Sequence, residues 1–361
     1  MNLQAIFNFR RFDWLLWLAV VLLIALGLVI QYSLNFTNQN FGTLYMQAGT
    51  AAAGMVLLVL LARWDYRSLM KSAWIVYLAS LLLLLATLII GRVAHGTRGW
   101  LFGFQVVEFA KLALVITLAR FWAAKKEAMY WPENIFKGLI LTIIPVVLIL
   151  LQPDFGSAMV LIGVGFLLLF LLDRRLKMVA LLVLVGMVVV AGAWLFVFKD
   201  YQKNRVLTFF DPARDPQGSG YQITQSIIAV GSGRLLGSGF ALGSQSQLKF
   251  LPEAKTDFAF SVVAEELGFL VSVLILVLYA LFFWRVWRLI REAYDDFGVL
   301  LAFGCGTVFL IQLAVNVGMN LGVAPITGIP LPFISYGGSS LIVSLAMVGL
   351  LESISSHQIK V

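Results

Sequence analysis

Long apolar runs separated by short polar segments occupy most of this 361-residue chain. Ten runs have roughly the length needed to cross a bilayer core of about 30 Å, and they are mainly apolar and rich in leucine. They lie near residues 14–33, 44–62, 72–91, 105–122, 136–152, 157–172, 178–198, 259–284, 298–318 and 336–354. The alternation typical of a barrel strand is missing from them, so the pattern predicts an all-α integral membrane protein with about ten transmembrane helices.

A polar excursion over residues 199–258 separates the seventh run from the eighth. It keeps many aromatic and aliphatic residues, more than a disordered segment carries. "YQITQSIIAV" (221–230) predicts a short amphipathic helix, and the glycine-rich stretch after it lets the backbone approach a ligand or a bilayer closely. We expect a partly helical extracytoplasmic lid within a single polytopic domain that spans residues 1–361.

A second irregular stretch, "GVAPITGIPLPFISYGGSS" (322–340), carries three prolines near membrane depth. Irregular backbone is tolerated at that depth only where it is buried in protein or lines a watery cavity. The stretch predicts either a connecting loop with a broken helix start or a re-entrant wall of a substrate cavity.

Composition and charge agree with a membrane protein and set its orientation. Hydrophobic residues make up 61% of the chain and charged residues 12%, and the mean hydropathy is +0.95. With the N-terminus inside, lysine and arginine gather in the inner segments, and the short outer loops hold only Arg92 and Arg98. The positive-inside rule then places both termini in the cytoplasm. The net charge of +8 is mainly an inner-face charge dispersed over separate loops, which argues against nucleic-acid binding.

Cysteine usage narrows the chemistry further. Cys305 is the only cysteine and lies in the ninth apolar run, so an intramolecular disulfide and a cysteine metal site are excluded.

Ionisable residues within apolar runs are candidates for function, because each costs roughly 2.5 to 3.5 kcal/mol to insert at the centre of a helix. Glu108 and Lys111 are three residues apart and share one helix face. They form either a buried ion pair that fixes helix packing or a site where Lys111 holds an anion and Glu108 orients it. Glu265 and Glu266 lie two turns into the eighth run, where at least one carboxylate needs a partner.

Asp257, in "LPEAKTDFAF" (251–260), stands where the long polar loop meets the eighth apolar run. Thr256 and Asp257 open that helix, so Asp257 is a candidate N-cap. A carboxylate at the boundary between water and lipid is also partly desolvated, and it serves as a general base if its pKa is raised. Both roles are compatible.

Four stretches in the same order resemble the signature motifs of the SEDS family (shape, elongation, division and sporulation). They are "LQPDFGSA", "GYQITQSIIAVGSGRLLGSG", "FLPEAKTDFAFSVVAEELG" and "NLGVAPITGIPLPFISYGGSS". With ten expected helices, the likeness covers nearly the whole chain. "GSQSQLKFLPE" is more similar to the rod-shape branch (RodA) than to the division branch (FtsW).

The resemblance implies a peptidoglycan glycosyltransferase of the bacterial inner membrane. Such an enzyme polymerises lipid II on the outer face, releases undecaprenyl diphosphate, serves cell elongation and rod shape, and works with a class B penicillin-binding protein. By the family pattern, Asp257 is the catalytic carboxylate. Two departures stand out: Gln105-Val106-Val107-Glu108 replaces the common Gln-Pro-Ser-Glu, and Lys255 takes the place of a frequent histidine.

This chemistry also suits the residues themselves. A lipid-linked sugar diphosphate enters from the bilayer, so acid and base groups belong at the outer helix ends, and the acceptor hydroxyl needs a base such as Asp257. The departing diphosphate needs cations or a divalent metal ion such as Mg²⁺ or Mn²⁺. Arg98 and Lys111 rank first, Lys111 together with Glu108. The other candidate cations are Arg205, Arg234, Lys249 and Lys255.

Two other functions stay open from the sequence. A transporter that flips lipid II would use the intramembrane charges and the broken helix near 325–332, but it predicts internal repeats that this chain lacks. A non-enzymatic scaffold for a penicillin-binding protein would use its helices and lid, with Asp257 as a plain cap.

Overall fold

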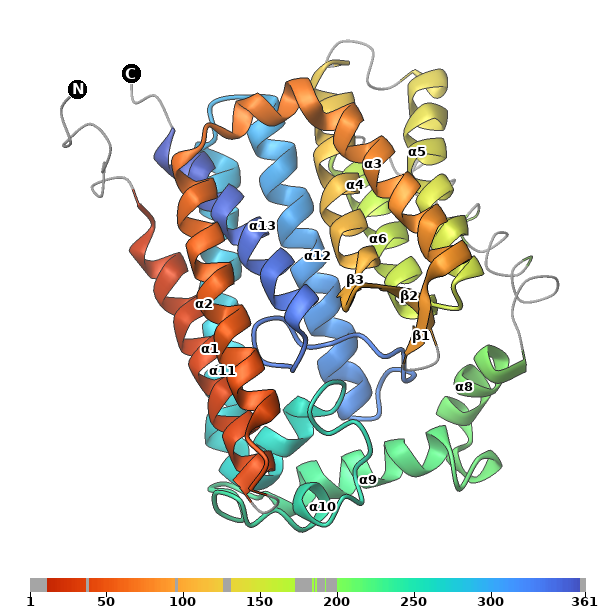
Figure 1. The fold of residues 1–361 in the computed structure, drawn as a ribbon, viewed down its shortest axis with the longest axis vertical. Coiled ribbons are helices and arrows are strands. Elements are labelled where there is room, and N and C mark those ends of the chain that lie inside the picture. Colours follow the sequence, from red (N-terminus) through yellow and green to blue (C-terminus); the bar gives the residue numbers. More distant parts are fainter. Residues whose placement is uncertain are drawn as a thin grey trace.

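The computed structural model describes residues 12–36, 39–94, 97–125, 131–172 and 200–357, together with Leu184, Gly186 and Gly192. Within these residues the chain is a bundle of long helices with a group of short helices at one end (Figure 1).

Nine apolar helices follow nine of the ten predicted spans. They are α1 (Trp14–Phe36), α2 (Gly42–Arg63), α3 (Leu69–Ile90), α4 (Val106–Ala123), α5 (Pro132–Leu151), α6 (Phe155–Leu172), α11 (Ala259–Glu292), α12 (Asp296–Asn320) and α13 (Gly338–Ser356). Seven of these nine are long and apolar enough to cross a membrane; α4 and α6 are the exceptions. The tenth span, 178–198, lies almost wholly outside the described residues, so the count of ten stays a prediction.

One part of the fold prediction was wrong, because the chain is not purely helical. The connection between α3 and α4 forms a three-stranded antiparallel sheet of β1 (Arg92–Ala94), β2 (Thr97–Leu101) and β3 (Phe104–Gln105). Phe102 and Gly103 both have positive φ, as the two-residue turn of a tight hairpin requires. The strands are much shorter than an apolar run that crosses a membrane, so the hydrophobic pattern does not reveal them.

Residues 200–258 are partly helical, as expected. They contain α8 (Asp200–Phe210), the 3₁₀ turn η5 (Pro212–Arg214), α9 (Ser219–Ser232) and the short α10 (Ser244–Gln247), all at the same end of the bundle in Figure 1. The helix predicted over 221–230 is therefore confirmed. The close backbone approach of the glycine-rich stretch is made to α11: a Cβ on Gly233 would lie 1.7 Å from the Ala264 carbonyl oxygen.

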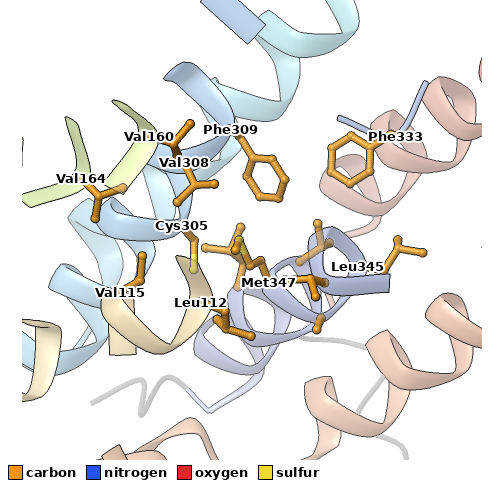
Figure 2. Close-up of a cluster of buried hydrophobic side chains, with 14 of the residues drawn as sticks. Leu112, Val115, Val160, Val164, Cys305, Val308, Phe309, Phe333, Leu345 and Met347 are labelled. Carbon is orange, nitrogen blue, oxygen red and sulfur yellow. The ribbon is translucent and has the colours of Figure 1, made fainter. Parts of the chain in front are cut away.

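The core lies around α12 and α13. Among the 18 residues of the apolar stretch of each helix, 83% are buried in α13 and 61% in α12, but only 22% in α2. In Figure 2, Val308 and Phe309 of α12 lie among side chains of α4, α6 and α13, with Phe333 beside them. Cys305 belongs to the same cluster and is fully buried as a free thiol.

The α12–α13 connection, residues 321–337, is irregular and runs between the helices (Figure 1). Ile329, Leu331 and Ile334 are each at most 2% exposed. Its carbonyl groups have partners: Asn316 Nδ2 donates to the Ile329 oxygen (2.7 Å) and the Tyr279 hydroxyl to that of Pro332. Most of the connection from Ile326 to Ser335 is therefore buried in protein, as irregular backbone at membrane depth requires.

Candidate active site at the start of α11

A tight turn, residues 251–258, leads into α11. The backbone N–H groups of Thr256, Asp257 and Phe258 all point to the Glu253 carbonyl oxygen, at 3.1, 3.1 and 3.3 Å. Leu251 and Phe258, at most 2% exposed, anchor its two ends in the core. We call residues 251–258 the α11 turn. Its polar residues are thus held between two buried apolar ones.

Two other elements hold the carbonyl groups of Lys255 and Thr256 in this turn. The Lys255 oxygen accepts from Gln31 Nε2 on α1 (3.0 Å) and from the Tyr336 N–H (2.8 Å). The next carbonyl, of Thr256, accepts from the Ser335 hydroxyl at 2.5 Å. The turn is therefore fixed to α1 and to the α12–α13 connection just before Asp257.

Two amides of α12 hold Asp257 itself. Asn316 Nδ2 and Asn320 Nδ2 each donate to its carbonyl oxygen at 3.0 Å, and both asparagines are fully buried. Asn320 is fixed in turn, because its Oδ1 accepts from the Ser261 N–H (3.0 Å) and hydroxyl (2.5 Å). The backbone that carries the carboxylate is therefore preorganised by buried hydrogen bonds.

The Asp257 side chain is half-buried. Its Oδ2 lies beside Gly328 of the α12–α13 connection, 3.6 Å from where a Cβ would stand. The prediction that Asp257 is the N-cap of α11 was wrong. Phe258, one residue later, is the N-cap, and it makes no side-chain cap hydrogen bond. The tertiary hydrogen bonds of the turn shift the start of the helix past Asp257.

A cleft opens on the other side of the α11 turn. Its volume is about 620 Å³, and both Lys249 and Lys255 line it. Lys255 Nζ donates to Asn35 Oδ1 (2.7 Å) and Thr43 Oγ1 (3.2 Å). Burial, and after it the charge of Lys249, lowers the pKa of Lys255 below its usual value. The structure thus brings two of the predicted cations together in one cleft, whose lining does not include Asp257.

Glu108 and Lys111 form the pair that their spacing predicts. Lys111 Nζ lies 2.7 Å from Glu108 Oε1, and both residues are 2% exposed. This geometry agrees with the structural alternative of a buried ion pair on α4. An anion that binds Lys111 here has to take the place of Glu108 as its partner.

The other predicted cations are spread over the loops. Arg98 is exposed on β2, and its N–H donates to the Gln152 carbonyl oxygen (3.2 Å). Arg205 is exposed on α8, and Arg234 is exposed after α9 with a positive φ of 48°. Unlike Lys249 and Lys255, these three arginines do not line the cleft.

Glu265 and Glu266 have the partners that their burial demands. Glu265 accepts from the Gln245 N–H (2.7 Å) and the Ser246 N–H (3.0 Å) of α10. Glu266 accepts from Gln247 Nε2 at 2.7 Å and from the Ser33 hydroxyl. The two carboxylates therefore tie α10 and α1 to α11, behind the cleft.

Sequence reasoning missed the residues that hold the turn. Asn316 and Asn320 are one helical turn apart in the apolar α12, and Gln31 lies near the end of α1. A polar side chain at membrane depth signals an interior position, and an i, i+4 pair of amides marks one helix face. The sequence therefore carries a signal for these buried amides.

Among the described residues, no group of three or more His, Cys, Asp or Glu side chains is arranged to hold a metal ion. A divalent cation held by one carboxylate and by substrate phosphates needs no such group, and it stays a prediction.

The bundle of apolar helices defines a polytopic membrane protein. Its candidate site is the half-buried carboxylate in a hydrogen-bonded polar turn at the start of α11. The chain belongs to the FtsW, RodA and SpoVE family of cell cycle proteins, whose model matches residues 13–360. The resemblance to the SEDS family is thereby confirmed.

Individual relatives match along nearly their full length. The peptidoglycan glycosyltransferase MrdB of Escherichia coli is 36% identical over 345 residues, which cover 94% of this chain and 93% of MrdB. The peptidoglycan glycosyltransferase RodA of Treponema pallidum is 31% identical, covering 96% of this chain and 98% of RodA.

Solved structures give the same result. A chain of a peptidoglycan synthase complex matches with a TM-score of 0.81 and 35% identity, covering 96% of this chain and 99% of its own. The rod shape determining protein RodA of Thermus thermophilus matches with a TM-score of 0.72 and 30% identity, covering 97% and 98%.

Proposed function

We propose that this chain is a peptidoglycan glycosyltransferase that polymerises lipid II into glycan strands, with Asp257 as the general base. Relatives with this activity in their names match it over nearly the whole chain. The observation that carries the proposal is the fixed α11 turn: hydrogen bonds hold three successive carbonyl groups, of residues 255–257, while the Asp257 side chain stays partly exposed. Such a preorganised carboxylate suits proton transfer from a substrate hydroxyl.

In the proposed reaction, Asp257 takes the proton of the acceptor sugar hydroxyl. The hydroxyl oxygen bonds to the anomeric carbon of the donor sugar, and the bond from that carbon to undecaprenyl diphosphate breaks. Negative charge develops on the departing diphosphate, so cations have to lie close to it. Arg98 and Lys111 remain our first candidates, Lys111 with Glu108 as its orienting partner, and a Mg²⁺ or Mn²⁺ ion is an alternative.

We place the reaction on the outer face of the bacterial inner membrane. Both termini are then cytoplasmic, residues 199–258 form an extracytoplasmic lid, and the rod-shape branch assigns the enzyme to cell elongation. The proposed partner is a class B penicillin-binding protein. A structural relative that is itself part of a peptidoglycan synthase complex supports such an assembly.

The decisive experiment replaces Asp257 with asparagine in the purified protein. An amide keeps the size of the side chain but does not accept the proton, so polymerisation of lipid II should fall by at least about 100-fold, the usual weight of a general base. Glycan products are measured on gels, folding by thermal denaturation, and partner binding by co-purification. Asp211→Asn, an exposed lid carboxylate paired with Arg214, is the matched control and should keep full activity.

Full polymerase activity of the Asp257→Asn variant would disprove Asp257 as the base. If lipid II crosses the membrane of liposomes that contain the protein faster than that of empty liposomes, the transporter alternative is supported instead. If the asparagine variant keeps the full activity of the complex with its partner, Asp257 has only a structural role and the scaffold alternative is supported.

A further inference from the structure

Helix α9 of the lid turns one polar side chain into the bundle. Ile223, Ser226 and Ala229 are spaced three residues apart on one face of α9, and each is at most 3% exposed. The outer two are apolar, whereas a buried hydroxyl such as that of Ser226 requires hydrogen-bond partners. Those partners lie on α11 and α12, so the side chain acts beyond its own helix.

The Ser226 hydroxyl joins three helices. It donates to the Asn320 carbonyl oxygen at 2.8 Å, and its oxygen lies 2.7 Å from Ser261 Oγ of α11. All three residues are fully buried. Asn320 is the last residue of α12, where carbonyl groups have no partner within the helix. The lid therefore supplies a partner that the end of α12 lacks.

These contacts lead directly to the α11 turn. Asn320 Oδ1 accepts from the Ser261 N–H at 3.0 Å, and Asn320 Nδ2 donates to the Asp257 carbonyl oxygen at 3.0 Å. Ser226 thus holds the main chain of Asn320, while Ser261 holds its side-chain amide. Two hydrogen bonds, both made by Asn320, connect the lid hydroxyl to the residue that carries the proposed base.

Close contacts on both sides of Ser226 fix α9 in this position. A Cβ added to Gly233, just after the helix, would lie 1.7 Å from the Ala264 carbonyl oxygen of α11. A Cβ added to Gly322 of the α12–α13 connection would lie 2.6 Å from Ile227 Cδ1. Only glycine permits such approaches. The place of the Ser226 hydroxyl is therefore set by the packing of the whole helix.

We propose that Ser226 is a positioning residue for the reaction at Asp257, so that α9 of the lid is a structural part of the active site. Without the Ser226 hydroxyl, the Asn320 carbonyl loses its partner and the end of α12 is held less firmly. Asn316 is then left to hold the Asp257 carbonyl, and the carboxylate spends less time in its productive orientation. This inference rests on the proposed polymerase function.

The first test separates positioning from substrate binding. In Ser226→Ala, assayed well below its melting temperature, kcat for lipid II polymerisation should fall about tenfold while KM stays within about twofold. Ser226→Thr keeps a hydroxyl and should restore most of the lost kcat. Ser232→Ala is the matched control on α9 and should keep the normal kcat, because the Ser232 hydroxyl donates only locally, to the Ala229 carbonyl oxygen.

Ser226→Cys gives the same test if the alanine variant does not fold. The thiol fills nearly the same space, but it is a weak hydrogen-bond donor. We expect kcat to fall in this variant as well, with KM again nearly unchanged.

The second test asks whether Ser226 acts through Asn320. Once Asn320→Ala has removed the amide that reaches Asp257, loss of the Ser226 hydroxyl has nothing further to displace. The double variant should therefore have the kcat of Asn320→Ala alone, within about twofold. Two independent defects would instead multiply.

The third test follows the α11 turn itself, without turnover. The N–H groups of residues 256–258 all point to the Glu253 carbonyl oxygen, so their hydrogen exchange reports how firmly the turn is held. Measured by mass spectrometry on the full-length protein, a peptide that covers 251–258 should exchange about tenfold faster in Ser226→Ala. Exchange in Ser232→Ala should equal that of the unmodified protein.

Three results would overturn the positioning role. These are a folded Ser226→Ala enzyme with normal kcat, defects of Ser226→Ala and Asn320→Ala that multiply, and unchanged exchange in the α11 turn. An equal fall of kcat in Ser232→Ala would also overturn it, since the effect would then be a general weakening of α9. If the polymerase proposal itself is wrong, Asp257→Asn keeps its activity, and the exchange measurement still reports whether Ser226 holds the turn.

Discussion

Asp257 owes its position to buried residues of α12 that hold its backbone. Its carbonyl oxygen accepts from Asn316 and Asn320, and Ser261 holds Asn320 in place. A buried amide that loses one partner leaves another polar group unpaired, which costs about 1–3 kcal/mol. These asparagines therefore contribute both to stability and to the direction in which the carboxylate points.

Replacing Asn320 with alanine should misplace the Asp257 carboxylate, our proposed general base. Small displacements of a catalytic group are costly, so we expect kcat for lipid II polymerisation to fall at least about tenfold with KM nearly unchanged. The assay is run well below the melting temperature of the variant. Thr142→Val removes a buried hydrogen bond to the Gly138 carbonyl on α5 and serves as the stability control. A folded Asn320→Ala enzyme with normal kcat would contradict the positioning role.

Among the elements, α11 depends on the lid, residues 199–258, because the helix α11 is broken at Gly268. That glycine has φ 78° and ψ −173°, a combination that residues with a Cβ hardly adopt. A break leaves backbone groups of the helix without partners. The lid satisfies them: the Phe269 N–H donates to the Arg234 oxygen (2.9 Å), and the Ser238 N–H donates to the Glu265 oxygen (2.8 Å).

Gly268→Ala should detach the lid from α11. The added Cβ would lie 2.2 Å from the Gly237 nitrogen, and the backbone strain alone costs about 1–3 kcal/mol. We expect a lower melting temperature and faster cleavage by trypsin after Arg234. Gly231→Ala in α9 is the matched control, since a Cβ there meets nothing within 4 Å, and it should leave both measurements unchanged. Equal trypsin resistance of the two variants would refute the role of the break.

For the whole molecule, polar contacts gather at two opposite ends of the bundle. At the end away from the lid, the Asp13 N–H donates to Glu352 Oε2 (3.0 Å) and Arg285 Nη2 lies 2.7 Å from Asp13 Oδ2. The α2–α3 connection joins them, because the Ser353 hydroxyl donates to the Trp64 carbonyl oxygen at 2.5 Å. The start of α1 and the end of α13 thus share one end, and the lid occupies the other (Figure 1).

Labelling of single cysteines tests which end faces the cytoplasm. Arg214 in the lid and Arg291 near the end of α11 are both exposed, and the native Cys305 is buried and should not react. A membrane-impermeant maleimide should label Arg214→Cys in spheroplasts, and it should label Arg291→Cys only after lysis. The unmodified chain is the control. The reverse pattern would place the proposed active site on the cytoplasmic side.

The sequence by itself determined the apolar helices, one buried ion pair and the family. Apolar runs predict helices well because backbone N–H and C=O groups in lipid have to be hydrogen-bonded within each segment. Accordingly, the ends of α2, α5 and α12 lie within four residues of those expected. The Glu108–Lys111 pair also follows from local spacing on one helix. Motif order then identified the family.

Only the tertiary structure decided how the site is assembled. Contacts between residues hundreds of positions apart, such as Gln31 with Lys255, depend on how the helices pack, and no local pattern encodes them. The same contacts moved the start of α11 beyond Asp257 and opened a cleft between the α1–α2 connection and the lid. Local spacing therefore predicts what a helix carries, whereas packing decides which side chains meet.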